Sequence, residues 1–243
     1  MFPYLNIFEV EISVYFLFIS LIFTAVVPII TMRAKALSLP AVQALDLYLF
    51  VLVGSFVGAR GMYVLYQEPS FYLEHPAQIL YFWNGGYIFF GGFLGAVVAG
   101  LLFCKMNAER PLKWLNFSIP ILSLGYAVGR IACFLSGCCY GKELDAWWSV
   151  FMHQAYRHPT QLYASFMEFL IFGVLVFIEK KKGFKSFLVF PLWMVLHGIA
   201  RIIMECFRDD PRGVEILGLS VSTNISIALM AVGFLMLVNK IKI

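Results

Sequence analysis

Charged residues are scarce in this sequence: Asp, Glu, Lys and Arg make up 13% of its 243 residues, whereas 61% are hydrophobic. A soluble domain usually has about a quarter charged residues and roughly half apolar ones. A single globule of this length cannot hide so much apolar surface from water. The composition therefore excludes a freely soluble domain and predicts an integral membrane protein.

Several sequence features that would indicate particular functions are missing. No cluster of Lys and Arg is interleaved with aromatic residues, so nucleic acid is not an expected partner despite the net charge of +4. The five cysteines lack the paired CxxC spacing of a structural zinc site, so we expect neither a metal nor a cofactor. The first apolar run has no basic segment before it and is followed by Arg33 and Lys35, which indicates a retained helix and not a cleaved signal peptide.

Seven apolar stretches are each long enough to cross a bilayer as a helix, which takes roughly 17–25 residues. They lie at about 12–31, 45–66, 86–104, 115–136, 160–179, 187–206 and 218–238. The predicted fold class is therefore all-α: a polytopic membrane protein of about seven transmembrane helices. We expect residues 1–243 to form a single integral membrane domain.

The connections between these stretches differ in positive charge. One alternating set, with the C-terminal tail, holds 11 of the 18 Lys and Arg residues, and the opposite set holds four. The 11 are Arg33, Lys35, Lys105, Arg110, Lys113, Lys180, Lys181, Lys182, Lys185, Lys240 and Lys242; the four are Lys142, Arg157, Arg208 and Arg212. Cytoplasmic loops carry the excess of Lys and Arg. We therefore expect the N-terminus outside and the C-terminus in the cytoplasm.

The remaining three arginines, Arg60, Arg130 and Arg201, lie inside predicted spans, each near the outer end. An arginine in hydrocarbon is costly and usually faces the bundle interior or a polar cavity. We favour one shared polar cavity near the outer leaflet, because Arg130 and Arg201 have further polar neighbours. The alternative is that each side chain reaches the outer headgroups separately.

Arg130 lies among small residues, with glycines at positions 125, 129 and 137. These let a lipid headgroup or another helix approach the backbone. The planar guanidinium of Arg130 would then suit a phosphate. Helix-packing glycines beside an arginine that reaches the headgroups fit the same pattern.

The fifth and sixth predicted spans also carry polar groups at their outer ends. Pro159 suits a first helical turn, and the helix that it begins can bind an anion at its N-terminus, although the polar residues that follow can also act only as caps. In the sixth span His197, Arg201, Glu205 and Arg208 share one helical face. We prefer a functional cavity there to a purely structural ion pair between Arg201 and Glu205.

Cys138 and Cys139 are adjacent, and Cys133 lies shortly before them. Three interpretations stay open: a disulfide between the neighbours, a metal or redox pair with Cys133, and packing as small apolar side chains.

Three segments, taken in order, resemble the prolipoprotein diacylglyceryl transferase family: GRIACF at 129–134, RHPTQLY at 157–163 and RIIMECFR at 201–208. The resemblance covers roughly residues 45–210 and indicates a divergent member with a GCCYG-type segment. Members of this family have seven spans with the N-terminus outside. They transfer a diacylglyceryl group from phosphatidylglycerol to the lipobox cysteine thiol of a preprolipoprotein, which forms a thioether and releases glycerol 1-phosphate.

The resemblance implies the same transferase activity here, in the inner (plasma) membrane of a bacterium. The implied partners are the phospholipid phosphatidylglycerol and the signal peptide of a prolipoprotein. By position, Arg130 would hold the lipid phosphate and Arg201 would stabilise the leaving phosphate, with Glu205 orienting an arginine. The candidate substrate-binding residues are Arg60, Gly129, Ser136, His158, Gln161, Tyr163 and Glu205.

The chain also departs from the family pattern. Phe90 replaces the histidine of a histidine-glycine-glycine motif, a proposed catalytic base, and Ala164 replaces a common glutamate. Cys133, Ser136 and Cys138 stand where the family has asparagines and a glutamate, and His197 replaces a tyrosine. We therefore assign His197 as the catalytic base beside Arg130 and Arg201. The alternatives are a related phospholipid-dependent transferase with another acceptor, and a lipid-binding member without activity.

Overall fold

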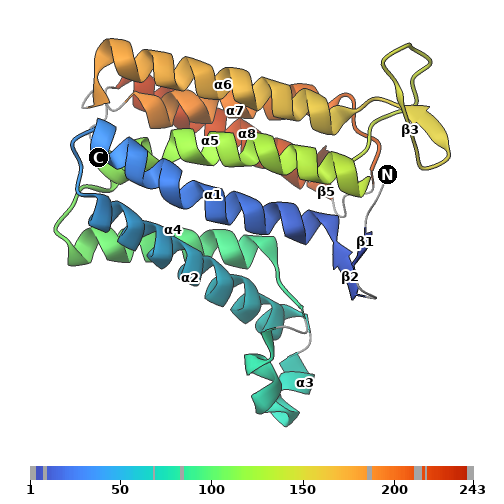
Figure 1. Cartoon of the computed structure of the whole chain (residues 1–243), viewed down its shortest axis with the longest axis horizontal. Helices are drawn as coiled ribbons and strands as arrows, with labels where there is room; N and C mark the ends of the chain where they lie inside the picture. The colour runs from blue at the N-terminus through green and yellow to red at the C-terminus, as the bar shows by residue number, and fades with distance from the viewer. Residues whose placement is uncertain are drawn as a thin grey trace. The chain divides into compact units, whose positions relative to one another are not determined.

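The computed structural model describes residues 4–7, 10–67, 69–82, 85–184, 188–210, 215–216 and 218–239. Seven long helices lie on the seven predicted stretches (Figure 1). They are α1 (Val14–Ala36), α2 (Ala41–Tyr66), α4 (Phe89–Met106), α5 (Pro111–Ser136), α6 (Thr160–Lys182), α7 (Val189–Glu205) and α8 (Val221–Val238). The predicted all-α class is therefore confirmed.

Six of the described helices are long and apolar enough to cross a membrane, namely α1, α2, α4, α5, α6 and α8. The seventh, α7, has 17 residues and includes His197 and Arg201. The chain is thus a multi-pass membrane protein, as predicted. Seven crossings, and the orientation of the two termini, stay predictions.

The shorter elements were not predicted from the sequence. They are α3 (Pro69–Glu74), the 3₁₀-helix η1 (Pro76–Leu80) and strands β1 (Tyr4–Ile7), β2 (Val10–Ser13), β3 (Val150–Met152), β4 (Ala155–Arg157), β5 (Glu215–Ile216) and β6 (Leu219–Ser220). The strands pair as three antiparallel hairpins, β1 with β2, β3 with β4 and β5 with β6.

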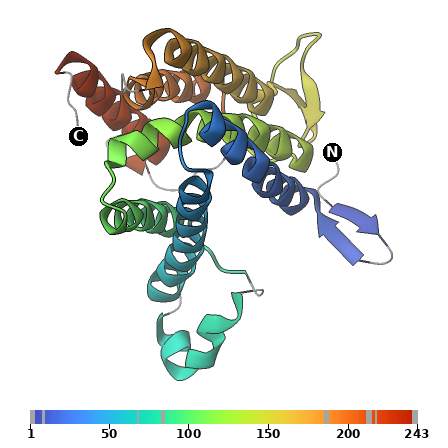
Figure 2. The same cartoon turned by 60° about the vertical axis from the view of Figure 1, so that its left-hand side comes forward.

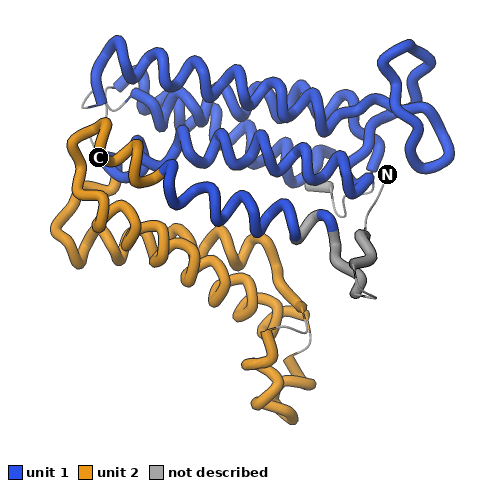
Figure 3. Tube along the Cα trace, in the orientation of Figure 1, with its two compact units in different colours: residues 1–29, 112–243 blue, residues 30–111 orange. Residues whose placement is uncertain are grey.

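The helices form two compact units, shown in different colours in Figure 3. One unit comprises residues 1–29 and 112–243, and the other comprises residues 30–111. Within the first unit α7 contacts both α6 and α8 (Figure 2). The second unit is built mainly on the contact between α2 and α4. A single domain over residues 1–243 stays a prediction.

A buried asparagine fixes the start of α7 against α5 in the first unit. Asn116 is fully buried, and its Oδ1 accepts a hydrogen bond from the Phe190 N–H at 2.9 Å. The first N–H groups of a helix have no partner within that helix, so this bond satisfies one of them. Leu175 and Val189 complete the apolar core nearby. The helices that carry Arg130 and Arg201 are thereby held together.

Close backbone contact between α2 and α4 depends on glycine in the second unit. A Cβ atom added to Gly95 would collide with the Gly54 carbonyl oxygen, and one added to Gly58 would collide with the Gly91 carbonyl oxygen. Small residues permit this approach between helices in a membrane, where apolar burial alone does not drive association.

We expect Gly95→Ala to lower the midpoint of thermal unfolding of the detergent-solubilised protein by several degrees. The added methyl group overpacks the helix contact, which costs about 1–3 kcal/mol. Gly61→Ala is the matched control, because a Cβ atom at Gly61 meets nothing within 4 Å. Equal midpoints for the two variants would contradict this account of the contact.

Candidate active site

The loops that follow α5 and α7 are joined at one end of the first unit. The N–H of Lys142 donates to the Phe207 carbonyl at 2.8 Å, and the N–H of Asp209 donates to the Tyr140 carbonyl at 3.3 Å. These bonds bring the C-terminal ends of α5 and α7 together. Since Arg130 lies in the last two turns of α5, the bonds position it relative to α7.

The guanidinium of Arg130 is held by a tyrosine one turn earlier in α5. Its Nη2 donates to the Tyr126 hydroxyl at 2.7 Å, and its Cζ lies 4.6 Å from the centroid of the Tyr126 ring. A cation over an aromatic face is attracted by the ring quadrupole. Among the described residues, the bond to Tyr126 is the one hydrogen bond that the Arg130 side chain makes. A guanidinium carries five N–H donors. Arg130 is thus oriented and retains donors for an anionic ligand.

Arg201 lies near Arg130 across the contact between α5 and α7. Its Nη2 lies 3.8 Å from Glu205 Oε2, one turn further along α7. Arg208 and Arg130 lie near enough to Arg201 to act on it electrostatically, so three cationic groups share one region. Cations in one region repel each other, and an anion bound among them relieves that repulsion. Glu205 offsets part of this charge and accepts a weak bond from the Ser222 hydroxyl at 3.3 Å.

Arg208, just beyond α7, differs from the other two because two of its donors are bonded to one carboxylate. Its Nε and Nη2 donate to the two oxygens of Asp210 at 2.8 and 2.7 Å. Burial lowers the pKa of Arg208, but the hydrogen bonds to Asp210 and the nearby negative charges together raise it above its usual value. Arg208 is therefore a permanent charge in a closed bidentate pair.

A buried carboxylate, which sequence reasoning missed, connects three helices beside these arginines. Glu168, in the middle of α6, is 1% exposed. Its Oε1 accepts from the Ser123 hydroxyl and from Trp193 Nε1, each at 2.9 Å. Its Oε2 lies 2.8 Å from His197 Nδ1. A lone acidic residue in an apolar span was the available signal, since such residues are rare and face the bundle interior.

His197 links this carboxylate to Arg130. Its ring stacks on Trp193 at a centroid distance of 4.8 Å and meets the Tyr126 ring edge-on at 5.0 Å. Because Tyr126 also holds Arg130, a continuous set of contacts runs from Glu168 to the arginine. Two of the three predicted catalytic residues, His197 and Arg130, thus contact one tyrosine ring.

The RHPTQLY run begins α6 and holds the loop that follows α5. Gln161 is buried, and its Nε2 donates to the Cys138 carbonyl at 2.5 Å. The Thr160 hydroxyl donates to the Cys139 carbonyl at 2.8 Å. His158 Nδ1 lies 3.4 Å from the Tyr163 hydroxyl. In this structure these side chains make contacts that stabilise the loop; contact with a substrate stays a prediction.

Two further predicted site residues lie on α5. The Ser136 hydroxyl donates to the Ala132 carbonyl of the preceding turn at 2.8 Å. A Cβ atom added to Gly129 would meet nothing within 4 Å, so the backbone beside Arg130 is open. Open backbone at this position is what a bound headgroup requires. No contact described here assigns Ser136 to a ligand.

Arg60 belongs to the second unit and is buried. Its guanidinium donates to five carbonyl oxygens: Gln78 at 2.9 Å, Ile79 at 3.2 Å, Tyr81 at 3.4 Å, Gly85 at 2.6 Å and Gly86 at 3.3 Å. These bonds occupy its donors and fix those five residues against α2. Substrate binding by Arg60 stays a prediction, and in this structure the side chain is a backbone clamp.

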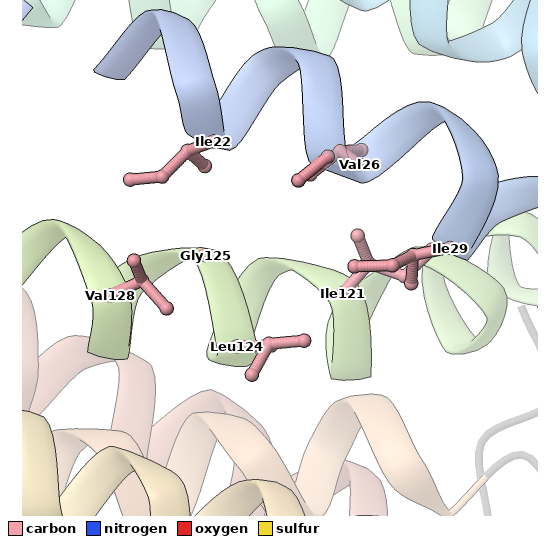
Figure 4. A pocket seen from close by; sticks show the side chains of 8 residues that line it. Ile22, Val26, Ile29, Ile121, Leu124, Gly125 and Val128 are labelled. Atoms are coloured by element: carbon pink, nitrogen blue, oxygen red, sulfur yellow. The ribbon is translucent and has the colours of Figure 1, made fainter. Parts of the chain in front are cut away.

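An apolar groove of about 120 Å³ lies between α1 and α5 (Figure 4). It is lined by Ile22, Ala25, Val26, Ile29, Ile121, Leu124, Gly125 and Val128. Gly125 and Val128 lie on either side of Tyr126 in the sequence of α5. The groove has a purely apolar lining, which suits a hydrocarbon chain next to the helix that carries Arg130.

The fold and this site define a class: a multi-pass membrane protein with a cationic site shared by two helices and an apolar groove beside it. The chain belongs to the prolipoprotein diacylglyceryl transferase family, because the family model matches residues 3–239. The resemblance seen in the three sequence segments is thereby confirmed.

Curated relatives agree over most of the chain. A protein of Clostridium tetani is 29% identical over 235 residues, which cover 94% of this chain and 93% of the relative. One of Bradyrhizobium diazoefficiens is 35% identical over 211 residues, 83% of this chain and 75% of the relative. One of Nitrosomonas europaea is 33% identical over 201 residues, which cover 79% of this chain and 71% of the relative. Each is named phosphatidylglycerol–prolipoprotein diacylglyceryl transferase.

We expect Glu168→Ala to destabilise the protein strongly, by about 3 kcal/mol, because it leaves one buried and two partly buried donors without their acceptor. The midpoint of thermal unfolding in detergent measures the effect. Glu168→Gln, which keeps one carbonyl oxygen as an acceptor, should lie between the wild type and the alanine variant. Ser123→Ala removes a single neutral donor and should cost about 1 kcal/mol. A Glu168→Ala variant as stable as the wild type would rule out the structural role of the carboxylate.

Proposed function

We propose that this chain transfers a diacylglyceryl group from phosphatidylglycerol to the lipobox cysteine thiol of a prolipoprotein. The reaction would take place in the inner (plasma) membrane of a bacterium, with the N-terminus outside and the prolipoprotein presented by its signal peptide. The observation that carries the proposal is the guanidinium of Arg130, held by Tyr126 with donors left for a phosphate and with Arg201 near enough to interact electrostatically. The substrates named for the relatives support it.

The reaction requires charge stabilisation more than it requires new covalent chemistry from the protein. The cysteine sulfur attacks the glyceryl carbon that bears the phosphate, a carbon–sulfur bond forms, and the carbon–oxygen bond breaks. The electron pair of the broken bond leaves on the phosphate, and the thiol proton goes to a base. Donors fixed where charge develops lower the barrier to such a step.

Arg130 and Arg201 are suited to different parts of this task. Arg130 is held by Tyr126 through a hydrogen bond and a ring contact, and the open backbone at Gly129 gives a headgroup room beside it. It would hold the phosphate of the bound lipid. Arg201 is tied to Glu205 only at 3.8 Å. It would stabilise the negative charge on the departing phosphate.

His197 is suited to accept the thiol proton. The Glu168 carboxylate accepts a hydrogen bond from Nδ1–H of His197. The hydrogen of the neutral imidazole is then on Nδ1, and Nε2 has a lone pair that can accept a proton. A carboxylate that fixes the tautomer of a histidine in this way is a common feature of general bases. This assignment gives the chain a base at a position different from Phe90.

The apolar groove between α1 and α5 would hold an acyl chain of the donor lipid. A chain lying along Ile22, Val26 and Leu124 would exchange contacts with lipid for contacts with protein, so the groove would orient the lipid by packing and not by removing apolar surface from water. The groove and Arg130 share α5, and one lipid would therefore contact both.

The substitution at Phe90 supports a second candidate: a lipid-binding member of the family without transferase activity. Phe90 begins α4 beside Phe89 and is exposed, so it offers no proton acceptor. In that case the arginines would bind phosphatidylglycerol and no thioether would form.

Arg130→Ala should reduce transfer at least 100-fold, because it removes the main donor to the phosphate. Transfer is measured with the purified protein, phosphatidylglycerol vesicles and a lipobox peptide, with mass measurement of the modified cysteine. Arg130→Lys keeps the charge without the planar fork and should recover only part of the activity. Arg110→Ala, on an exposed loop, is the control and should retain full activity.

The same variants are then introduced into a strain depleted of its own transferase. Wild-type protein should restore growth and place a diacylglyceryl group on a lipoprotein N-terminus. Bound phosphatidylglycerol with no product from the wild-type protein would instead support the lipid-binding candidate. Full activity in Arg130→Ala would remove the phosphate-binding role on which the proposal depends.

His197→Asn should lower transfer by about 100-fold or more, the usual contribution of a general base. The asparagine amide can still donate to Glu168 in place of Nδ1–H, so the bundle should remain folded and phospholipid binding should change little. His75→Ala, an exposed histidine of the second unit, is the control. If His197→Asn transfers at the wild-type rate, the proton acceptor lies elsewhere.

A further inference from the structure

Three thiols meet where α5 ends. Cys133 is in the last turn of α5, and Cys138 and Cys139 follow the helix. Their three Sγ atoms all lie within 4.8 Å of one another, and all three cysteines are free. The proposed transfer reaction uses none of these sulfurs.

The backbone is bent in a way that brings the sulfurs together. Gly137 has φ of +77° and Cys139 has φ of +60°, so the chain turns back on itself after the helix. A left-handed conformation costs a residue other than glycine about 1–2 kcal/mol. The N–H of Cys138 donates to the Cys133 carbonyl at 3.2 Å, which closes the turn.

The start of α6 holds the turn in place from the other side. Gln161 and Thr160 donate to the carbonyl oxygens of Cys138 and Cys139, respectively. Because Gln161 and Thr160 are both buried, the backbone of the two cysteines is fixed by side chains that have little freedom to move. The positions of the sulfurs are thus set by a rigid frame and not by a mobile loop.

The surroundings favour negative charge on sulfur. The Cys138 thiol donates to the Cys133 carbonyl at 3.6 Å, and the positive charges of Arg208 and Arg130 act on Cys139. A thiolate is the form of cysteine that binds metal ions.

We propose that Cys133, Cys138 and Cys139 bind one thiophilic d¹⁰ cation, Zn²⁺ or Cu⁺, through three sulfur ligands. Soft thiolates select these ions. In a tetrahedral site with Zn–S bonds of about 2.3 Å the sulfurs are about 3.8 Å apart, so sulfurs within 4.8 Å need to shift by about 1 Å at most. Cys138 is exposed, which gives an ion a path to the site and leaves a position for a fourth ligand.

Charge balance is consistent with this ligand set. Three thiolates and Zn²⁺ carry a net charge of −1, and three thiolates and Cu⁺ carry −2. Arg130 and Arg208 act on this region and offset that charge. A disulfide would use two of the sulfurs and leave the third without a role, whereas one cation accounts for all three.

The site is tested with the full-length protein in detergent after reduction. Co²⁺, the spectroscopic substitute for Zn²⁺, should bind at one ion per chain and give a sulfur-to-metal charge-transfer band, and Zn²⁺ should displace it. In a separate arm Cu⁺ is added with a competing chelator, and one ion per chain should be retained. Binding in either arm supports the site and identifies the preferred ion.

Cys133→Ser, Cys138→Ser and Cys139→Ser should each weaken binding at least tenfold and remove the charge-transfer band. Cys206→Ser is the matched control, since Cys206 is an exposed thiol outside the cluster, and it should bind like the wild type. Circular dichroism of each variant checks that the helices remain folded. The proposal does not rest on the transfer reaction, because metal binding is measured without either substrate.

Either of two results would overturn the proposal of a metal site. A reduced protein that binds neither ion at one per chain has no such site. Alkylation and mass measurement of unreduced protein that show a disulfide between two of the three cysteines, with no metal bound after reduction, would replace the proposal with a redox pair.

Discussion

The carboxylate of Glu168 is the interaction on which the first unit depends. It is buried in the middle of α6, and it accepts hydrogen bonds from α5 through Ser123 and from α7 through Trp193 and His197. Taking an ionised carboxylate out of water costs several kcal/mol, so the group is tolerated only with such a full set of partners. The same bonds set where α5 and α7 lie, and with them the two arginines. The stability of the first unit and the geometry of the site therefore both depend on the buried carboxylate of Glu168.

The arginines in the predicted spans show how one residue type acquires different tasks. Arg60 is surrounded by carbonyl oxygens, and Arg208, just past α7, is closed by Asp210. Arg130 is held on one side by an aromatic ring and a single hydroxyl. A guanidinium with unused donors is where an anionic ligand can bind, and only the surroundings of each arginine reveal this.

The sequence was sufficient to predict the helices and the family, because both depend on signals that are local in the chain. Apolar length defines a span without any knowledge of its neighbours, and the GRIACF, RHPTQLY and RIIMECFR segments are contiguous. The bounds differ most at α1, which ends at Ala36 and not near residue 31, because the helix continues beyond the apolar run through Arg33 and Lys35.

What the sequence did not indicate depends on contacts between distant residues. Glu168 and Tyr126 were overlooked, since their importance follows from partners 25 to 29 residues away on α7 and from a ring shared with His197. For the three cysteines the sequence left a metal or redox role open without a spacing to support it, because a left-handed turn at Cys139 brings their sulfurs together. The Arg60 clamp likewise depends on carbonyl groups 18 to 26 residues away in the chain.

The Arg60 clamp also affects which backbone groups can lie within the hydrocarbon of the membrane. Carbonyl oxygens that lack donors in hydrocarbon cost several kcal/mol each. Arg60 supplies donors to those of Gln78, Ile79, Tyr81, Gly85 and Gly86 from a single side chain. These five carbonyl groups therefore need no water, so their burial at membrane depth would not carry that cost.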